Sequence, residues 1–421
     1  MLKSIIFPTC LAFAVLLLLS GCQVGRFFVY NFANITDHKV FPASEIETGP
    51  ETYRFTKTDD NYLTAYTVST RKKGDLSLTD YLREETTTTA FLVIRNDSIL
   101  YENYFQGYAP DDISTFFSVS KSITSLLVGI AVDEGLIENI DDPVTKYIPE
   151  LRTADPGFQQ QTIRHLLNMR SGLDYKESYS NPFADMAQLY YGRNQLGQIA
   201  KMKFRETPGT VHRYQSVSTA ILGIIVEKVS GMDLGQFTEA KVWQPMGMEF
   251  PGSWSLDDKK HGSAKGYSGL NATARDLAKI GRLYLNGGLW DGKRIVSEDW
   301  VRSSVVPDMD NDAYQFQWYG VDDTARDSTG QYMTFPDSLS AVAATEKFKV
   351  PHQEVYERPS APGEWRVHIA TAEFYAMGIL NQLMIIDPKT NTIVIRLGKK
   401  WDDGYLGLMR RVRGYVNTDS K

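Results

Sequence analysis

The sequence predicts an α+β fold, in which an antiparallel sheet built from both chain ends is flanked by helices and interrupted by an inserted all-α domain. Apolar runs of strand length lie at 90–105 and again at 374–397. Between them, from about 141 to 285, apolar residues recur mainly with helical spacing. Strands at both ends and helices in the middle favour one sheet to which the two termini contribute.

Each element has its own local signal. Residues 90–94 and 98–105 are separated by Arg95-Asn96-Asp97, a typical hairpin turn. A long apolar helix is predicted after Ser118, ending at Gly135, because glycine commonly follows a helix C-terminus. Further apolar runs predict helices at 163–169, 218–229 and 274–285, and strands at 374–379, 382–386 and 392–397.

The domain boundaries follow from these elements. We expect a leader at 1–22, a tether and N-terminal extension at 23–74, a sheet domain at 75–140 and 286–421, and a helical domain at 141–285. Residues 306–365 show little periodicity and are too many for an ordinary loop. They are interpreted as a lid or an insertion near the cleft between the domains.

Composition excludes several classes of function. The chain has 421 residues, is 42% hydrophobic and carries a net charge of −6, which describes a globular protein without an overall basic surface. No nucleic-acid partner is therefore expected. No metal is expected, because the six histidines are scattered without a metal-binding spacing: His38, His165, His212, His261, His352 and His368. No other cofactor is expected either. His165 and His212 are interpreted as structural.

The first 22 residues have the pattern of an export signal. Lys3 precedes an apolar run, which Leu19-Ser20-Gly21-Cys22 closes. This tetrapeptide resembles the lipobox of bacterial lipoproteins, in which Cys22 becomes the lipid-modified N-terminus. Cys10 is lost with the leader, so no disulfide is expected. The sequence predicts an exported lipoprotein of the cell envelope, held to a membrane by its lipid and, with Gln23 after the cysteine, sorted to the outer membrane in a Gram-negative cell. A plain signal peptide or short anchor is the alternative.

Ser118-Val119-Ser120-Lys121 is the candidate catalytic motif. Positions i and i+3 share one helix face, so the hydroxyl and the amine are expected to meet. A serine needs a nearby base, and a lysine is a base only when burial and the positive end of a helix keep it neutral. The spacing occurs again at Ser69 and Lys72, in a polar stretch with no helix behind it. That second copy is interpreted as a solvated loop, and the alternative for Ser118 is an ordinary serine cap.

With this motif placed, the chain resembles the serine hydrolases of the class C β-lactamase and penicillin-recognising superfamily, in particular the 6-aminohexanoate oligomer hydrolases and related esterases. The resemblance runs from about Phe91 to Leu397 and implies a β-lactamase-like fold. Its landmarks, in order, are Ser118-Val119-Ser120-Lys121-Ser122, Arg164-His165-Leu166-Leu167 with Ser171-Gly172-Leu173, Pro208-Gly209-Thr210 before Tyr214-Gln215-Ser216, Gln244-Pro245-Met246-Gly247-Met248, Gly269-Leu270 with Ala274-Arg275-Asp276-Leu277-Ala278, and Phe374-Tyr375-Ala376-Met377-Gly378.

The resemblance implies roles for further residues. Tyr214 matches the tyrosine of the second motif and would shuttle a proton, its pKa lowered by the neighbouring lysine ammonium. Tyr101 and Tyr179 also fit the tyrosine spacing, but one lies in a predicted strand and the other in a loop. The backbone N–H groups of Ser118 and Ile379 would form the oxyanion hole.

Two further residues are substrate or network candidates. Ser216 is expected to orient the catalytic groups or contact substrate, and Gly378 to let the strand backbone approach the substrate. Lys389-Thr390-Asn391 is rejected as the third motif because it sits in a predicted turn and lacks the glycine.

The resemblance therefore implies a serine hydrolase that cleaves a small-molecule ester or amide through an acyl-enzyme on Ser118. Without a lysine in the third motif, no obvious cation would hold the carboxylate of a β-lactam. A D-amino-acid peptidase of penicillin-binding type or a β-lactamase remains one alternative. A non-catalytic binding or sensor lipoprotein of the same fold is the other, although Ser118, Lys121 and Tyr214 are all present.

Overall fold

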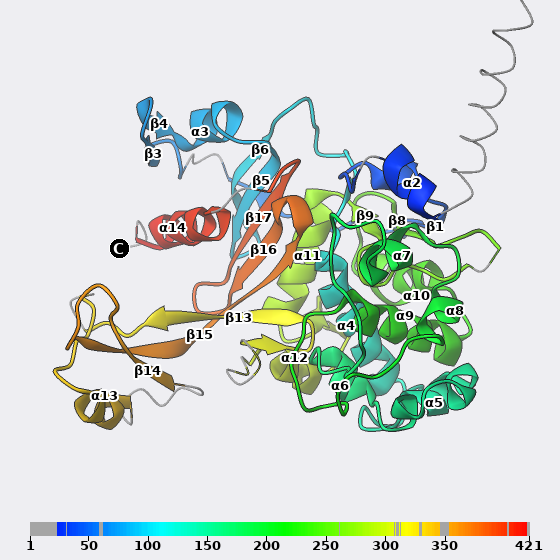
Figure 1. Ribbon diagram of the computed structural model, residues 1–421. Helices are drawn as coiled ribbons and strands as arrows, with labels where there is room; N and C mark the ends of the chain where they lie inside the picture. Colours follow the sequence, from blue (N-terminus) through cyan, green and yellow to red (C-terminus); the bar gives the residue numbers. More distant parts are fainter. Residues whose placement is uncertain are drawn as a thin grey trace, which may run out of the picture.

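A computed structural model describes residues 23–418, except 31, 59–61, 261, 307, 309–310, 312, 328–330, 346–352 and 402–403. The leader and Cys22 lie outside the described residues. A nine-stranded sheet dominates the fold, in the order β12-β13-β15-β16-β17-β5-β6-β2, with β14 paired to β15 (Figure 1). Its strands are β2 (Thr56–Lys57), β5 (Thr88–Arg95), β6 (Ser98–Tyr104), β12 (Tyr314–Gln315), β13 (Trp318–Thr324), β14 (Gln353–Glu357), β15 (Trp365–Gly378), β16 (Gln382–Asp387) and β17 (Thr392–Gly398).

The centre of the sheet joins the two ends of the chain. Strand β17 pairs with β5 in an antiparallel register that sets Val394 opposite Val93. All pairs in this sheet are antiparallel except that of β2 with β6. The predicted sheet of both termini is confirmed, as are the hairpin at 95–97 and the turn between β16 and β17.

Helices cover both faces of the central strands, so these strands are buried on both sides. One face packs on α11 (Ala274–Leu285) and α4 (Val119–Asp133). The other packs on α14 (Tyr405–Thr418) and α3 (Leu78–Glu84). Side chains alternate between the two cores along each strand, for example Leu92 on the first face and Val93 on the second.

The remaining helices gather beside the sheet, and most of them pack on α9, which itself packs on α4 (Figure 1). They are α2 (Gln23–Val29), α5 (Val144–Tyr147), α6 (Ile163–Leu167), α7 (Asp185–Tyr191), α8 (Gln195–Ile199), α9 (Ser216–Ser230), α10 (Leu234–Thr238) and α12 (Glu298–Val305). Helix α9 ends at Gly231 with φ of +69°, and Gly135 after α4 has φ of +72°, as the sequence predicts for residues that follow a helix.

Helix α11 lies within 141–285, the segment expected to form the helical domain, yet packs on β5, β16 and β17, because its apolar side faces the sheet. Residues 23–74, the expected tether and N-terminal extension, contribute strands. Their strand β1 (Ala43–Ile46) joins a second sheet in the order β1-β8-β9-β7, with β7 (Ser114–Thr115), β8 (Gly252–Ser255) and β9 (Leu270–Ala272). Two hairpins complete the strands, β3 (Thr67–Thr70) with β4 (Gly74–Ser77) and β10 (Leu289–Trp290) with β11 (Lys293–Arg294).

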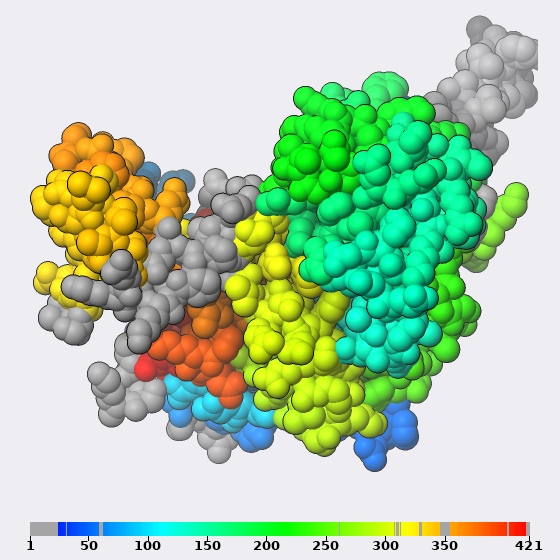
Figure 2. Space-filling model, turned by 90° about the horizontal axis from the view of Figure 1, so that it is seen from below, coloured from blue at the N-terminus to red at the C-terminus, as the bar shows by residue number. Residues whose placement is uncertain are grey.

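The insertion predicted at 306–365 forms an arm. Strand β14, the outer parts of β13 and β15, and α13 (Ser338–Thr345) enclose a small core of their own, which includes Ala325, Ala341 and Val367. In Figure 2 this yellow and orange arm projects from the body of the molecule. Within the described residues, no helix is long and apolar enough to cross a membrane.

Candidate active site

Ser118 stands at the start of α4, directly after a strained turn. Phe117 has φ of +48°, a conformation uncommon for a bulky side chain and retained only where the surroundings enforce it. Both Phe116 and Phe117 are buried, which anchors the turn from β7 into the helix. The turn presents Ser118 at a cavity, whereas α4 behind it is buried along nearly its whole length.

Lys121 is buried beneath this serine. Its Nζ lies 2.9 Å from Ser118 Oγ and donates another hydrogen bond of 2.9 Å to the Tyr267 carbonyl oxygen. Burial lowers the pKa of Lys121 to about 7, against the opposing charge of Glu177. A large fraction of the amine is therefore neutral near neutral pH. The structure thus places an amine that is partly neutral near pH 7 within hydrogen-bond reach of the hydroxyl, as the i, i+3 spacing predicts.

Tyr214 is a second side chain in contact with Ser118. Its phenol is hydrogen-bonded to Ser118 and Tyr319, and its ring lies 5.0 Å from Lys121 Nζ. The expected lowering of its pKa is wrong, because burial raises the pKa of Tyr214 well above its usual value. Burial also lowers the pKa of Lys121. The lysine ammonium that was expected to stabilise a Tyr214 phenolate is therefore only partly populated near neutral pH. Tyr214 is therefore a protonated phenol near neutral pH and can donate a proton.

The carboxylate of Glu177 is a site residue that the sequence analysis does not identify. Glu177 accepts hydrogen bonds from the Ser216 backbone N–H at 2.8 Å, the Ser216 hydroxyl at 2.7 Å and the Tyr179 phenol at 2.7 Å. Ser216 is fully buried at the start of α9 and contacts Glu177 rather than Ser118. The negative charge suits the positive end of α9 and raises the pKa of Lys121. The loop at 177 carries no sequence signal for this role, since only folding brings it to the helix.

Gly378 ends β15 against the backbone of the serine turn. A Cβ at this position would lie 2.4 Å from the Phe116 carbonyl oxygen and 3.1 Å from the Ser118 backbone nitrogen. The glycine thus permits a close approach of two backbones, here of β15 to residues 116–118. Ile379, the next residue, lines the two cavities that meet at Ser118 and are described below. This places the 118 and 379 segments side by side, the arrangement that an oxyanion hole requires.

Substitution of Gly378 by alanine is expected to lower kcat for an ester by about 10²-fold, because the methyl group must displace the Phe116–Ser118 backbone. Overpacking of this kind should also lower the melting temperature. Gly414→Ala in α14 is the matched control, since a Cβ there meets no atom within 4 Å. If Gly378→Ala retained the wild-type kcat and melting temperature, the close approach would not be required.

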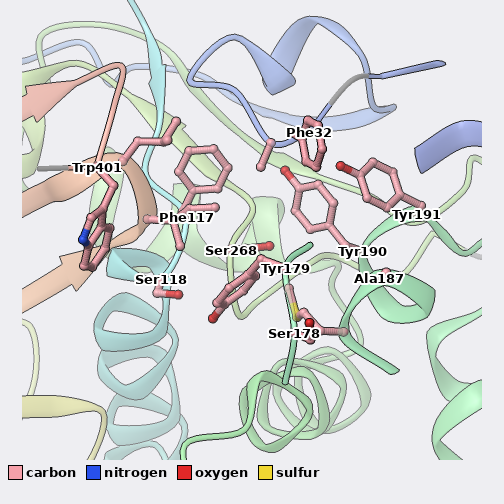
Figure 3. Close-up of a pocket in the computed structure, with 14 residues that line it drawn as sticks. Phe32, Phe117, Ser118, Ser178, Tyr179, Ala187, Tyr190, Tyr191, Ser268 and Trp401 are labelled. Carbon is pink, nitrogen blue, oxygen red and sulfur yellow. The ribbon is translucent and has the colours of Figure 1, made fainter. Parts of the chain in front are cut away.

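Two cavities meet at Ser118, and Figure 3 shows the first of them. The first, the α7 cavity, has a volume of about 270 Å³ and extends toward Tyr190 and Tyr191 of α7 and toward Phe32. The second, the Tyr214 cavity, has a volume of about 310 Å³, is more open, and is lined by Tyr214 and Tyr319. Ser118, Tyr179, Ile379 and Trp401 border both. Among the described residues, the lining of neither cavity includes a Lys, Arg, Asp or Glu side chain.

The other candidates fall outside this cluster. Ser69 and Lys72 lie in the exposed β3–β4 hairpin, and Lys389 to Asn391 form the turn after β16. Tyr101 in β6 is hydrogen-bonded to Thr79. Tyr179, set aside as a loop residue, in fact lines both cavities. His165 closes a capping box with Thr162, a structural role. Within the described residues, no group of three or more His, Cys, Asp or Glu could hold a metal ion.

An antiparallel sheet beside a helical region, with a serine and a buried lysine one turn apart between them, defines a β-lactamase-fold serine hydrolase. The chain belongs to the Beta-lactamase family, whose profile matches residues 78–406. It is 30% identical to the 6-aminohexanoate-dimer hydrolase of Paenarthrobacter ureafaciens over 330 residues, covering 76% of this chain and 74% of that one. It is also 30% identical to esterase EstB of Burkholderia gladioli over 190 residues, covering 40% and 47%.

Solved structures support the fold. The putative 6-aminohexanoate-dimer hydrolase from Bacillus anthracis superposes with a TM-score of 0.69 at 22% identity, covering 91% of this chain and 92% of that one. EstCE1, a hydrolase with promiscuous acyltransferase activity, superposes with a TM-score of 0.55 at 16% identity, covering 80% and 95%. The recognised family and fold are confirmed, and the protein is a hydrolase related to esterases and amide hydrolases.

Proposed function

We propose that the protein hydrolyses an ester or amide through an acyl-enzyme on Ser118, with Lys121 and Tyr214 as the acid and base. The observation that carries this proposal is the 2.9 Å separation of Lys121 Nζ from Ser118 Oγ, together with the lowering of the Lys121 pKa to about 7. A neutral amine at this distance can take the hydroxyl proton as the nucleophile attacks.

In acylation, Ser118 is the nucleophile, Lys121 the base and Tyr214 the acid. The neutral amine of Lys121 removes the proton from Ser118 Oγ, which bonds to the carbonyl carbon of the substrate. The carbonyl oxygen becomes an oxyanion that accepts hydrogen bonds from the backbone N–H groups of Ser118 and Ile379. The Tyr214 phenol protonates the leaving group as the scissile bond breaks, and the Lys121 ammonium returns a proton to Tyr214. The acyl group remains on Ser118.

Deacylation reverses these roles. A water molecule takes the place of the leaving group, gives a proton to the Lys121–Tyr214 pair and attacks the acyl carbon. The second tetrahedral intermediate collapses, the proton returns to Ser118 Oγ, and the acid is released. The Ser216 hydroxyl donates a hydrogen bond to Glu177, so in this scheme Ser216 holds that carboxylate in place.

The cavity linings favour substrates that carry no charged group next to the ester or amide bond to be cleaved. Neither cavity is lined by a charged side chain among the described residues, so neither offers an ion-pair partner to a β-lactam or peptide carboxylate. The names of the esterase and amide-hydrolase relatives support the same bond types. The 6-aminohexanoate-dimer hydrolase covers 76% of this chain, against 40% for the esterase, 42% for the D-alanine hydrolase and 37% for the penicillin-binding relative.

The direct test is intact-protein mass after incubation with a fluorophosphonate probe, combined with hydrolysis of p-nitrophenyl acetate. The wild type is expected to gain one adduct, mapped to the peptide that carries Ser118, and to turn over the ester. Ser118→Ala should gain none. Absence of both label and turnover in the wild type would instead support a binding or sensor protein. Turnover of a D-alanyl peptide or a penicillin faster than a neutral ester would favour the peptidase or β-lactamase.

The rate is expected to rise with pH through about 7, since only neutral Lys121 acts as the base. Glu177→Gln removes the charge that raises the Lys121 pKa, so the rise of the rate with pH, the acidic limb of the profile, should move to lower pH. The measurement is kcat/KM for a neutral ester across the pH range of stability. Glu206→Gln, which removes a carboxylate paired with Arg213, is the control. A limb unmoved in Glu177→Gln would show that Lys121 is not the titrating group.

We also propose that Cys22 carries a lipid that holds the enzyme in the cell envelope of its host. The support is the Leu19-Ser20-Gly21-Cys22 sequence after an apolar run. Full-length protein expressed in bacteria should incorporate labelled palmitate and partition with membranes, whereas Cys22→Ala should do neither. Equal labelling of both forms would contradict the proposal.

A further inference from the structure

The far wall of the α7 cavity comes from a part of the chain that precedes the family match. Phe32 and Ala33 line this wall, whereas the match begins at residue 78. Phe32 lies opposite Ser118 across the cavity, next to Tyr190 and Tyr191 of α7 (Figure 3). The N-terminal extension therefore contributes to the interior of the site.

This wall is firmly held. Phe27 of α2 is 3% exposed, and its ring packs edge-on against Tyr191 at 5.4 Å and against Phe32 at 5.5 Å. The Tyr190 hydroxyl donates a 2.5 Å hydrogen bond to the buried carboxyl group of Asp37, which also belongs to the extension. These contacts fix α7 and the extension to each other, so the shape of the cavity depends on both.

The two cavities differ in what they offer to the two sides of a scissile bond. Tyr214, the proposed donor to the leaving group, lines the Tyr214 cavity and not the α7 cavity. A leaving group must therefore lie in the Tyr214 cavity, and the acyl group extends from Ser118 into the α7 cavity. Apart from Ser118, Ser178 and Ser268, the α7 cavity is lined by aromatic and aliphatic residues, and Phe32 and Trp401, each 54% exposed, stand at its solvent side.

We propose that the α7 cavity is the acyl subsite, that it takes an uncharged apolar acyl group of medium length, and that Phe32 of the N-terminal extension contributes to this preference. The inference rests on the proposed function of Ser118 and Tyr214. A linear acyl chain gains favourable burial with each methylene that enters an apolar cavity. A charged acyl group would lose its hydration there without an ion-pair partner among the described lining residues.

The test is a series of p-nitrophenyl esters from acetate to octanoate, below their micelle concentrations, with kcat/KM measured for each. Each added methylene should raise kcat/KM by about threefold until the cavity is filled. In the wild type the octanoate-to-acetate ratio should therefore exceed ten. An ester with a terminal carboxylate on an acyl chain of equal length should be a much poorer substrate than its neutral counterpart.

Phe32→Ala should lower the octanoate-to-acetate ratio by at least fivefold. Phe28→Ala should leave it unchanged, since Phe28 is also an exposed phenylalanine beside Phe27 but does not line the cavity. Melting temperatures equal to that of the wild type would establish that both variants fold.

A wild-type octanoate-to-acetate ratio near one, or an equal change of this ratio in both variants, would overturn the inference. Hydrolysis of the acetate ester by the wild type would still support the proposed function in that case. Absence of acetate hydrolysis in the wild type would overturn the proposed function itself.

Discussion

Replacement of Ser118 by alanine is expected to lower kcat by on the order of 10⁴-fold or more, because without the hydroxyl no acyl-enzyme can form. The fold should be retained. Ser118 is only partly buried, alanine is compatible with a helix start, and Lys121 keeps its hydrogen bond to the Tyr267 carbonyl. Circular dichroism and the melting temperature should therefore match the wild type. The readout is turnover of a neutral p-nitrophenyl ester.

The chain supplies a matched control for this substitution. Ser69 has the same spacing to Lys72 but lies on the exposed β3–β4 hairpin, hydrogen-bonded to Asp75. Ser69→Ala should retain full activity. If Ser118→Ala kept more than a tenth of the wild-type rate, another nucleophile would have to be sought among the groups that line the two cavities.

Replacement of Lys121 by methionine should lower kcat by on the order of 10³-fold or more, since the hydroxyl then lacks its base. Methionine is unbranched, apolar and adaptable, so it can occupy the buried position. The variant should also lose the rise in rate through about pH 7, which reports deprotonation of Lys121. The measurement is the pH profile of kcat/KM.

Two controls accompany the lysine variant. Lys72→Met, in the exposed copy of the motif, should keep both the rate and the pH profile. The Ser118→Ala, Lys121→Met double variant should be no slower than Ser118→Ala alone, because residues that act as one unit are not additive. A further loss in the double variant, or an intact pH limb in Lys121→Met, would argue against Lys121 as the base.

The core of the site could be predicted because its signals are local. Ser118 and Lys121 are three residues apart on one helix, and the apolar run behind them requires burial of that helix. Tyr214 and Gly378 could be placed by resemblance, since each lies in a short motif of fixed order. The β-strands and their turns could be read from apolar runs and turn residues for the same reason.

The sequence by itself determined the central antiparallel sheet, the buried helix after Ser118 and the hydroxyl–amine pair, because short-range spacing and hydrophobic pattern specify these features. Only the tertiary structure decided the surroundings of that pair. It brought Glu177 to the start of α9, carried α11 onto the sheet and set Phe32 across the cavity from Ser118. It also raised the pKa of Tyr214, since desolvation depends on the atoms packed around a group and not on its neighbours in the chain.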